Sequence, residues 1–301
     1  MTTQSYLNHL EPFLKAIKPM ELIPTGAEPY YRRDKGIKAL IFDIYGTLII
    51  SASGDIMQAG YDASMFKRSL DASGFEILVP DSGLMTIHTL FEEEVTQGKE
   101  AAKAAGTPFP ELNIVEIWRK TLSRAEDRGL IKGIDKADLR LFTFIFELSS
   151  NQVWPMPKMT KTIDALREKG YPLGIVSNAQ FYTPVMMNYF FSGKIHGEEF
   201  LDGFERDLSV FSYKMLKGKP DTAVYEALVE PLAKRGLKPS EVLYVGNDML
   251  KDMYASQQVG FKTCFYAGDM RAYRLRKDHP QASKTKPDYV ITELSQLLEI
   301  V

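Results

Sequence analysis

The segment KALIFDIYGTLIIS, residues 38–51, determines how the rest of the sequence is interpreted. Four apolar residues lead to a single carboxylate, Asp43, and Gly46 and Thr47 then interrupt the apolar pattern. A short, continuous apolar run bounded by a glycine is typical of a parallel strand that is covered on both faces. We therefore expect a buried strand at 38–43, with Asp43 at its carboxyl end.

The composition is that of an ordinary globular protein. The 301 residues are enough for one large or two modest domains, and 45% of them are apolar while 25% are charged. The net charge of −2 creates no broad field that favours nucleic acid or an anionic membrane. No apolar stretch approaches the roughly 18–20 residues that span a bilayer, and the N-terminus lacks a secretory pattern. We therefore expect a cytoplasmic protein with no nucleic-acid or membrane partner; the sequence does not indicate an oligomeric state.

Helical and strand-like patterns divide the chain into three parts. Beyond residue 158, amphipathic helical segments alternate with short apolar segments such as LGIV (173–176) and VLYV (242–245). This alternation predicts an α/β fold with a doubly wound parallel sheet. Residues 55–150 instead show apolar residues at helical spacing, which predicts a helical bundle. We expect an N-terminal extension at 1–36, an α/β core at 37–54 and 155–301, and a helical domain at 55–154.

Polar residues follow the predicted strands at the point where each strand ends. In open parallel sheets, ligands bind beyond the carboxyl ends of the strands. These positions combine a carboxylate that can act as a nucleophile, groups that can hold anionic oxygens, and further acids that can bind a metal. Phosphoryl transfer needs this combination. The residues at the strand ends are Asp43, Ser177, Asn178, Asp248 and Asp252, and a loop before the predicted helix at 221 supplies Lys219.

The order of these groups resembles the haloacid dehalogenase (HAD) superfamily of hydrolases. Four motifs of that superfamily occur in sequence: Asp43-Ile44-Tyr45-Gly46-Thr47, Ser177-Asn178, Lys219-Pro220, and Gly246-Asn247-Asp248 with Asp252. The resemblance covers about residues 37–301. It implies the Rossmann-like α/β core of these hydrolases, with a helical cap inserted after the first strand.

The resemblance also implies a role for each motif residue. Asp43 would attack a small-molecule substrate and form a covalent aspartyl intermediate, which water then hydrolyses. Thr47 would position Asp43. Lys219 would neutralise charge on Asp43 and on the transferring group, while Ser177 and the adjacent Asn178 would bind the anionic group of the substrate.

A Mg²⁺ site is implied at the same place. The ion would be held by Asp43, by the backbone carbonyl of Tyr45, and by Asp248 or Asp252. Asn247 stands where many relatives have an Asp, so the closer of the two acidic ligands is left open. Two carboxylates about 4 Å apart repel by roughly 4 kcal/mol at an effective dielectric near 20, and a divalent cation is the usual means of offsetting that repulsion.

Tyr45 leaves the reaction open. Most phosphatases of the superfamily have a second Asp at this position as a general acid and base, which is typically worth about 10²- to 10⁴-fold in rate. The dehalogenases have Asp-x-Tyr-Gly-Thr instead, because a departing halide needs no proton. They also need a basic cap residue that holds the substrate, and Arg68 is a candidate for this role. Tyr45 is a further candidate for binding the substrate. We expect a Mg²⁺-dependent phosphomonoester hydrolase. The alternatives are a metal-independent 2-haloacid dehalogenase and a non-catalytic binding protein on the same fold.

Overall fold

A six-stranded parallel sheet forms the centre of the protein. The computed structural model describes residues 3–52, 61–196 and 200–301. The strand order is β10-β9-β8-β1-β6-β7, and every neighbouring pair is parallel. The predicted α/β fold is therefore confirmed. The strands of this sheet are β1 (Ala39–Phe42), β6 (Leu173–Ser177), β7 (Ser209–Phe211), β8 (Val242–Gly246), β9 (Lys262–Tyr266) and β10 (Tyr289–Ile291).

Strand β1 lies where the chain reverses its direction of winding. After β1 the chain continues to β6 and β7 on one side, and then returns to β8 on the other side. Leu40 and Phe42 belong to the hydrophobic core on one face of the sheet, whereas Ala39 and Ile41 belong to the core on the other. Burial on both faces explains why this strand is continuously apolar. Asp43 follows it at the crevice where α/β proteins bind ligands.

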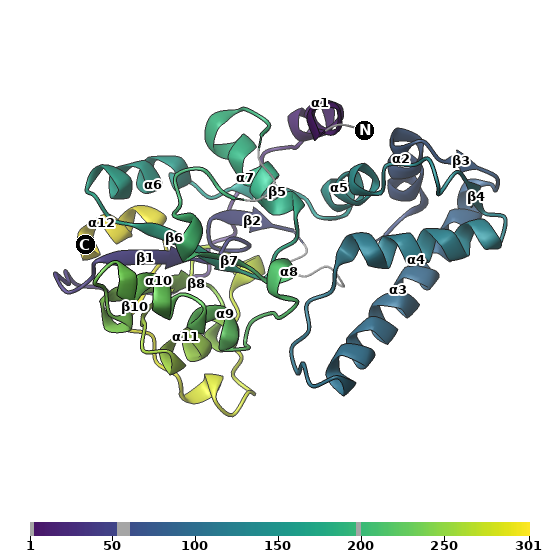
Figure 1. The fold of residues 1–301 in the computed structure, drawn as a ribbon. Helices are drawn as coiled ribbons and strands as arrows, with labels where there is room; N and C mark the ends of the chain where they lie inside the picture. The colour runs from purple at the N-terminus through teal and green to yellow at the C-terminus, as the bar shows by residue number, and fades with distance from the viewer. Residues whose placement is uncertain (1–2, 53–60, 197–199) are drawn as a thin grey trace.

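Helices cover both faces of the sheet (Figure 1). Helices α6 (Met159–Glu168) and α12 (Leu297–Ile300) lie over one face. Helices α9 (Ala223–Glu226), α10 (Val229–Lys234) and α11 (Ala255–Gln258) lie over the other. A π-helical segment, η4 (Met249–Tyr254), follows β8 and continues into α11. The other short elements are α7 (Tyr182–Ser192), α8 (Ser212–Met215), η2 (Arg206–Leu208), η3 (Pro239–Glu241), η5 (Met270–Ala272), η6 (Ala282–Lys284) and η7 (Leu294–Gln296).

A helical insert separates β1 from β6. It contains α2 (Ala63–Ser73), α3 (Asp81–Ala104), α4 (Ile114–Asp127) and α5 (Leu139–Ser150), with a small ribbon of β3 (Glu76–Ile77) and β4 (Ile131–Lys132). Trp118 lies at its centre, stacked on Phe91 with ring centroids 4.1 Å apart and edge-on to Phe142. The helical bundle predicted for residues 55–150 is confirmed over the described residues 61–150, which form these four helices. The predicted boundary between residues 54 and 55 lies outside the described residues.

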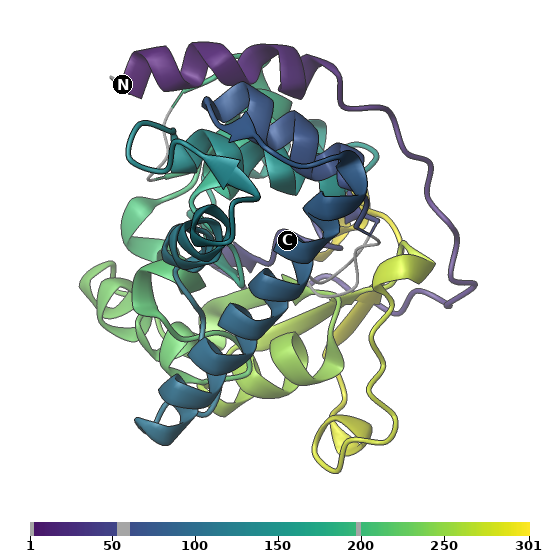
Figure 2. The same ribbon diagram turned by 90° about the vertical axis from the view of Figure 1, so that its right-hand side faces the viewer.

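The insert is joined to the sheet domain by an antiparallel ribbon and by the N-terminal segment. The ribbon consists of β2 (Ile49–Ser51) and β5 (Val153–Pro155). Helix α1 (Thr3–Lys15) packs against α5 of the insert, with Leu10 and Leu14 buried. The following segment then runs to the edge of the sheet, where Tyr30 pairs with Val290 of β10 (Figure 2). No helix in the described part of the chain is long and apolar enough to cross a membrane.

Candidate active site

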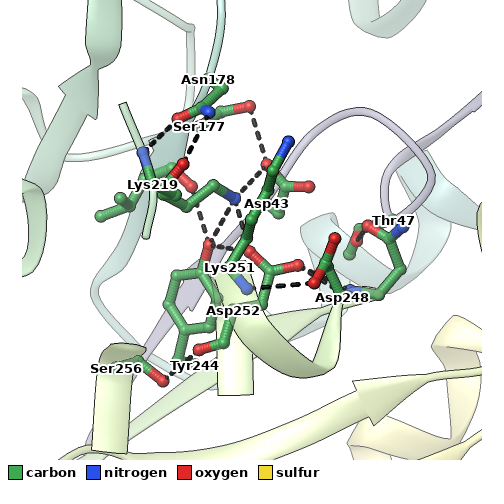
Figure 3. Close-up of polar contacts among 12 residues, drawn as sticks. Asp43, Thr47, Ser177, Asn178, Lys219, Tyr244, Asp248, Lys251, Asp252 and Ser256 are labelled. Carbon is green, nitrogen blue, oxygen red and sulfur yellow. Dashed lines mark hydrogen bonds and ion pairs between the residues drawn. The ribbon is translucent and has the colours of Figure 1, made fainter. Parts of the chain in front are cut away.

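Asp43 and Lys219 meet at the carboxyl edge of the sheet (Figure 3). Asp43 directly follows β1 and is only 6% exposed. Its Oδ1 accepts a hydrogen bond from Ser177 Oγ at 2.8 Å and lies 2.8 Å from Lys219 Nζ. Neither contact uses Oδ2, which leaves this second oxygen for a ligand in the adjoining cavity. The structure thus brings together three groups that are distant in the sequence.

Lys219 is enclosed by two carboxylates and a tyrosine. Besides Asp43, its Nζ lies 2.5 Å from Asp252 Oδ1 and donates to the hydroxyl of Tyr244 at 3.1 Å. Burial alone would lower the pKa of Lys219, but the two carboxylates raise it above its usual value. The ammonium group is therefore charged at neutral pH and can stabilise negative charge that develops beside Asp43.

Asn178 holds the backbone of Lys219 from both sides. Its Oδ1 accepts a hydrogen bond from the Lys219 amide at 2.7 Å, and its Nδ2 donates to the Lys219 carbonyl at 3.2 Å. Asn178 was expected to bind substrate. It does line the cavity beside Asp43, but its amide already has two protein partners that position the lysine.

Asp252 has all of its hydrogen-bonding positions occupied by protein. Its Oδ1 receives Lys219 and the hydroxyl of Tyr244, and its Oδ2 accepts the backbone amides of Asn247 and Asp248 at 3.0 and 2.9 Å. The side chain is only 1% exposed. Asp252 therefore organises the loop after β8 and is poorly placed to be a direct metal ligand.

Asp248 lines the cavity over Asp43 and forms an ion pair with Arg276. Its Oδ1 caps η4 by accepting the amides of Leu250 and Lys251, and its Oδ2 accepts two guanidinium hydrogen bonds from Arg276, at 2.6 and 3.0 Å. Burial would raise the pKa of Asp248, but these hydrogen bonds and the charge of Arg276 lower it below its usual value.

The charges of the acid cluster are offset by protein side chains. A divalent cation was expected in that role, whereas in the structure Lys219 faces Asp43 and Asp252, and Arg276 faces Asp248. Carboxylate repulsion is therefore not by itself an argument for a metal. Sequence reasoning missed Arg276 because it lies 28 residues beyond Asp248, in a loop without a motif.

Thr47 does not contact Asp43 through its hydroxyl. Its Oγ1 donates to Asn247 Oδ1 at 3.1 Å, and the amide nitrogen of Asn247 donates to the carbonyl of Ala272 at 2.7 Å. The backbone turns sharply before Thr47, where Gly46 has a φ of +81°, and a Cβ at Gly46 would lie 2.5 Å from the side chain of Ala272. Gly46 and Thr47 thus fit the turn against the loop after β8, which fixes Asp43 only indirectly.

Tyr45 lies between two cavities. Its hydroxyl is 2.9 Å from Thr183 Oγ1, and its side chain is partly buried. Burial raises the pKa of Tyr45 far above its usual value, and the nearby carboxyls of Glu147 and Asp43 add to that rise. The phenol is therefore neutral and is a poor substitute for the second Asp of the phosphatases.

Two adjoining cavities lie above the edge of the sheet. The smaller has a volume of about 140 Å³ and lies over Asp43, and the larger has a volume of about 240 Å³ and extends towards the insert. Both are lined by Tyr45, Ser51, Asn178 and Lys251. In the smaller cavity, basic side chains outnumber acidic ones, so the cavity suits an anion. These side chains are Lys219, Lys251, Arg274 and Arg276 against Asp43, Asp248 and Asp252.

The structure does not bring Arg68 to this site. It lies on the exposed side of α2 and lines neither cavity, because α2 uses Phe66 and Leu70 to pack into the insert. The charged residues that the insert contributes to the larger cavity are instead Lys99, Glu111 and Glu147. None of them belongs to a motif, and their positions depend on how the insert is placed against the sheet.

A family model described as haloacid dehalogenase-like hydrolase matches residues 37–260. The chain belongs to this family. The resemblance read from the four motifs is therefore confirmed, and with it the assignment as a hydrolase. The matched region includes Asp43, Ser177, Lys219 and Asp248, whereas the N-terminal segment lies before it.

Curated relatives of this hydrolase include two phosphatases. A glyceraldehyde 3-phosphate phosphatase from Pyrococcus furiosus is 24% identical over 88% of this chain and 93% of its own. A phosphoglycolate phosphatase from Escherichia coli K12 is 24% identical over 87% of this chain and 91% of its own. Among solved structures, a 2-haloacid dehalogenase from Pseudomonas syringae pv. Tomato shares the fold with a TM-score of 0.52, at 24% identity over 87% of this chain and 97% of that one.

Proposed function

We propose that this hydrolase cleaves a small phosphomonoester through a covalent intermediate on Asp43. The Oδ2 oxygen attacks phosphorus, the bond between phosphorus and the ester oxygen breaks, and the released alkoxide takes up a proton. Water then attacks the aspartyl phosphate, which releases inorganic phosphate and regenerates the carboxylate. The observation that carries this proposal is the small cavity over Asp43, in which four basic side chains face three acids.

The basic side chains have distinct proposed roles. Lys219 stabilises charge on Asp43 Oδ1 and on the transferring group, because its ammonium lies 2.8 Å from that oxygen. Lys251 lines the junction of the two cavities and binds a phosphoryl oxygen there. Ser177 keeps Asp43 oriented through its 2.8 Å hydrogen bond. The names of the curated relatives support a phosphomonoester as the substrate.

Mg²⁺ is the proposed cofactor. Its hard-oxygen preference matches Oδ2 of Asp43, the backbone carbonyl of Tyr45 and Oδ2 of Asp248. Among the described residues no ready-made cluster of three metal-binding side chains is present, and Asp248 Oδ2 is held by Arg276. The Arg276 side chain is 38% exposed, so it can turn outward when the ion binds. The bound ion would neutralise phosphoryl charge.

Tyr45 favours dehalogenation as the second candidate. A halide leaves without a proton, so the absence of a second Asp costs nothing in that reaction. Arg68, the residue considered for holding the substrate carboxylate, lines neither cavity. The phosphatase therefore remains the function that the geometry supports best.

A panel of phosphomonoesters and 2-haloacids, each assayed with and without EDTA, tests the proposal. We expect phosphate release that EDTA abolishes, no halide release, and loss of activity in Asp43→Asn. Metal-independent halide release would establish the second candidate instead. Beryllium fluoride with Mg²⁺ should raise the melting temperature, because it mimics an aspartyl phosphate and binds only the folded protein. A non-catalytic protein on this fold would show no such shift.

A further inference from the structure

The larger cavity is the place where the leaving group would lie. It adjoins the cavity over Asp43, with which it shares Tyr45, Asn178 and Lys251. A phosphoryl group bound at Asp43 therefore directs its ester oxygen and the attached group towards the insert. At about 240 Å³, this cavity accommodates a small organic group.

Glu147 of α5 brings an acid to this cavity without a basic partner. Its Oε1 accepts a hydrogen bond from Asn151 at 3.1 Å, and its Oε2 accepts one from the hydroxyl of Tyr182 at 3.0 Å. Both partners are neutral, and within the described ranges no lysine, arginine or histidine forms an ion pair with Glu147. Burial raises the pKa of Glu147, and the two hydrogen bonds only partly oppose that rise. The carboxylate form is thus incompletely stabilised by its own surroundings.

The other charged residues of the cavity lining are Lys99, Lys251 and Glu111. Glu111 accepts hydrogen bonds from Gln180 and Ser212 at 2.8 and 2.7 Å, and burial raises its pKa while the charge of Lys99 opposes that rise. Lys251 lies at the junction with the phosphoryl cavity, where an anion would offset it. Of the two acids in this lining, Glu147 is therefore the one on which no basic residue of the described chain acts, so a basic group of a ligand would complement it.

We infer that Glu147 selects phosphomonoesters whose small leaving group carries a protonated amine and disfavours those whose leaving group carries a carboxylate, an inference that rests on the phosphatase function proposed above. An ammonium group would donate a charge-assisted hydrogen bond to the free lone pairs of Glu147. A substrate carboxylate would meet a like charge in a partly buried cavity, where the repulsion is stronger than in water. A hydroxyl group would fall between these cases, because it donates a hydrogen bond without charge.

Three esters of similar size test this order. They are 2-aminoethyl phosphate, 2-hydroxyethyl phosphate and phosphoglycolate, compared by kcat/KM with p-nitrophenyl phosphate as a reference substrate. We expect kcat/KM to decrease in that order. In Glu147→Gln, the amine ester should lose about 10- to 100-fold, the range for a hydrogen bond to a charged group, while the hydroxyl ester changes by less than about threefold. Glu116→Gln, on the exposed side of α4, is the matched control and should leave all three values unchanged.

The outcomes separate this inference from the proposed function. If phosphoglycolate is the best of the three esters, or if Glu147→Gln lowers all three equally, the selection by Glu147 is refuted while the phosphatase assignment stands. If the reference substrate is hydrolysed but none of the three esters is, the selection is likewise refuted. If no phosphoester is hydrolysed, the proposed function fails and the inference fails with it. The ranking by the wild-type protein decides the question even if the variant does not fold.

Discussion

Arg276 binds the carboxylate of Asp248 through two guanidinium nitrogens, at 2.6 and 3.0 Å from the same oxygen. That oxygen is the one proposed to ligate Mg²⁺, so the guanidinium of Arg276 and the Mg²⁺ ion compete for it. We expect Arg276→Gln to bind Mg²⁺ about three- to tenfold more tightly, a range that corresponds to the loss of one partly exposed ion pair. Titration calorimetry, or the melting temperature as a function of Mg²⁺ concentration, measures this without relying on turnover.

The matched control is Lys277→Gln, which removes the same charge from the next position in an exposed stretch. Its Mg²⁺ affinity should equal that of the wild type. Unchanged or weaker binding in Arg276→Gln would show that Oδ2 of Asp248 is not a ligand of the ion.

The two hydrogen bonds from Asn178 to the backbone of Lys219 predict a combined loss of stability and activity. Asn178→Ala leaves the amide and carbonyl of Lys219 without these partners, which should cost about 1–3 kcal/mol in the free energy of unfolding. The lysine loop is then less well positioned, and we expect kcat to decrease at least about tenfold. Denaturant unfolding and steady-state kinetics provide the two values.

Asp62→Ala separates these two effects. Asp62 caps α2 by accepting the amides of Ser64 and Met65, so its loss should cost about 1 kcal/mol of stability without lowering kcat. If Asp62→Ala and Asn178→Ala reduce kcat alike, the decrease reflects instability and not the position of Lys219.

Tyr45→Asp should raise the turnover of alkyl phosphates. An aspartic acid at this position supplies the proton donor that Tyr45, with its raised pKa, cannot replace. General acid–base catalysis is typically worth about 10²- to 10⁴-fold, and we expect at least the lower end of that range. In the control Tyr45→Asn, the new side chain has a shape similar to that of aspartic acid but cannot donate the proton. The turnover of this variant should not increase. Equal turnover in the two variants would contradict the proton-donor explanation.

The raised pKa of Glu147 predicts a pH-dependent effect on stability. The folded state binds the proton of this carboxyl more tightly than the unfolded state, whose pKa is near the ordinary glutamate value. Stability is therefore lost as the pH rises from that ordinary value through the raised one. Glu147→Gln removes this loss. Its melting temperature relative to the wild type should increase as the pH rises above the ordinary glutamate pKa of about 4, and a difference that is constant with pH would argue against a raised pKa.

The alternation of helices and strands predicted the parallel sheet, and the motifs predicted the meeting of Asp43, Ser177 and Lys219. For Asp43 and Ser177 the prediction succeeds because parallel strands place their carboxyl ends at one edge, so a residue's position relative to its strand determines where it lies. Lys219 lies in a loop and not at a strand end. The role of Thr47 was less predictable. Its hydroxyl donates to Asn247, which lies in the loop after β8. That contact depends on the turn of the backbone at Gly46.

Residues from the insert and from long loops were not predictable. Arg276 is placed by the path of an irregular segment after β9, and no local pattern encodes that path. Glu147 lies on helix α5. The apolar pattern of this helix indicates which side is buried, but it does not indicate which cavity the polar side faces. Arg68 is the opposite case, because its helix forms where it was predicted but the side chain is exposed to solvent. Side chains that depend on how two separately packed units face each other therefore require coordinates.

The N-terminal segment is a further attachment of the insert, besides the β2–β5 ribbon and the hydrogen bonds of Glu111 and Glu147 to the sheet domain. Its helix α1 is packed on α5, while Tyr30 is paired with the outermost strand, β10. Moving the insert outward would therefore require either separating α1 from α5 or straightening the chain between α1 and Tyr30. A stretch that precedes the matched family region is thus one of the restraints on how far the insert can move away from Asp43.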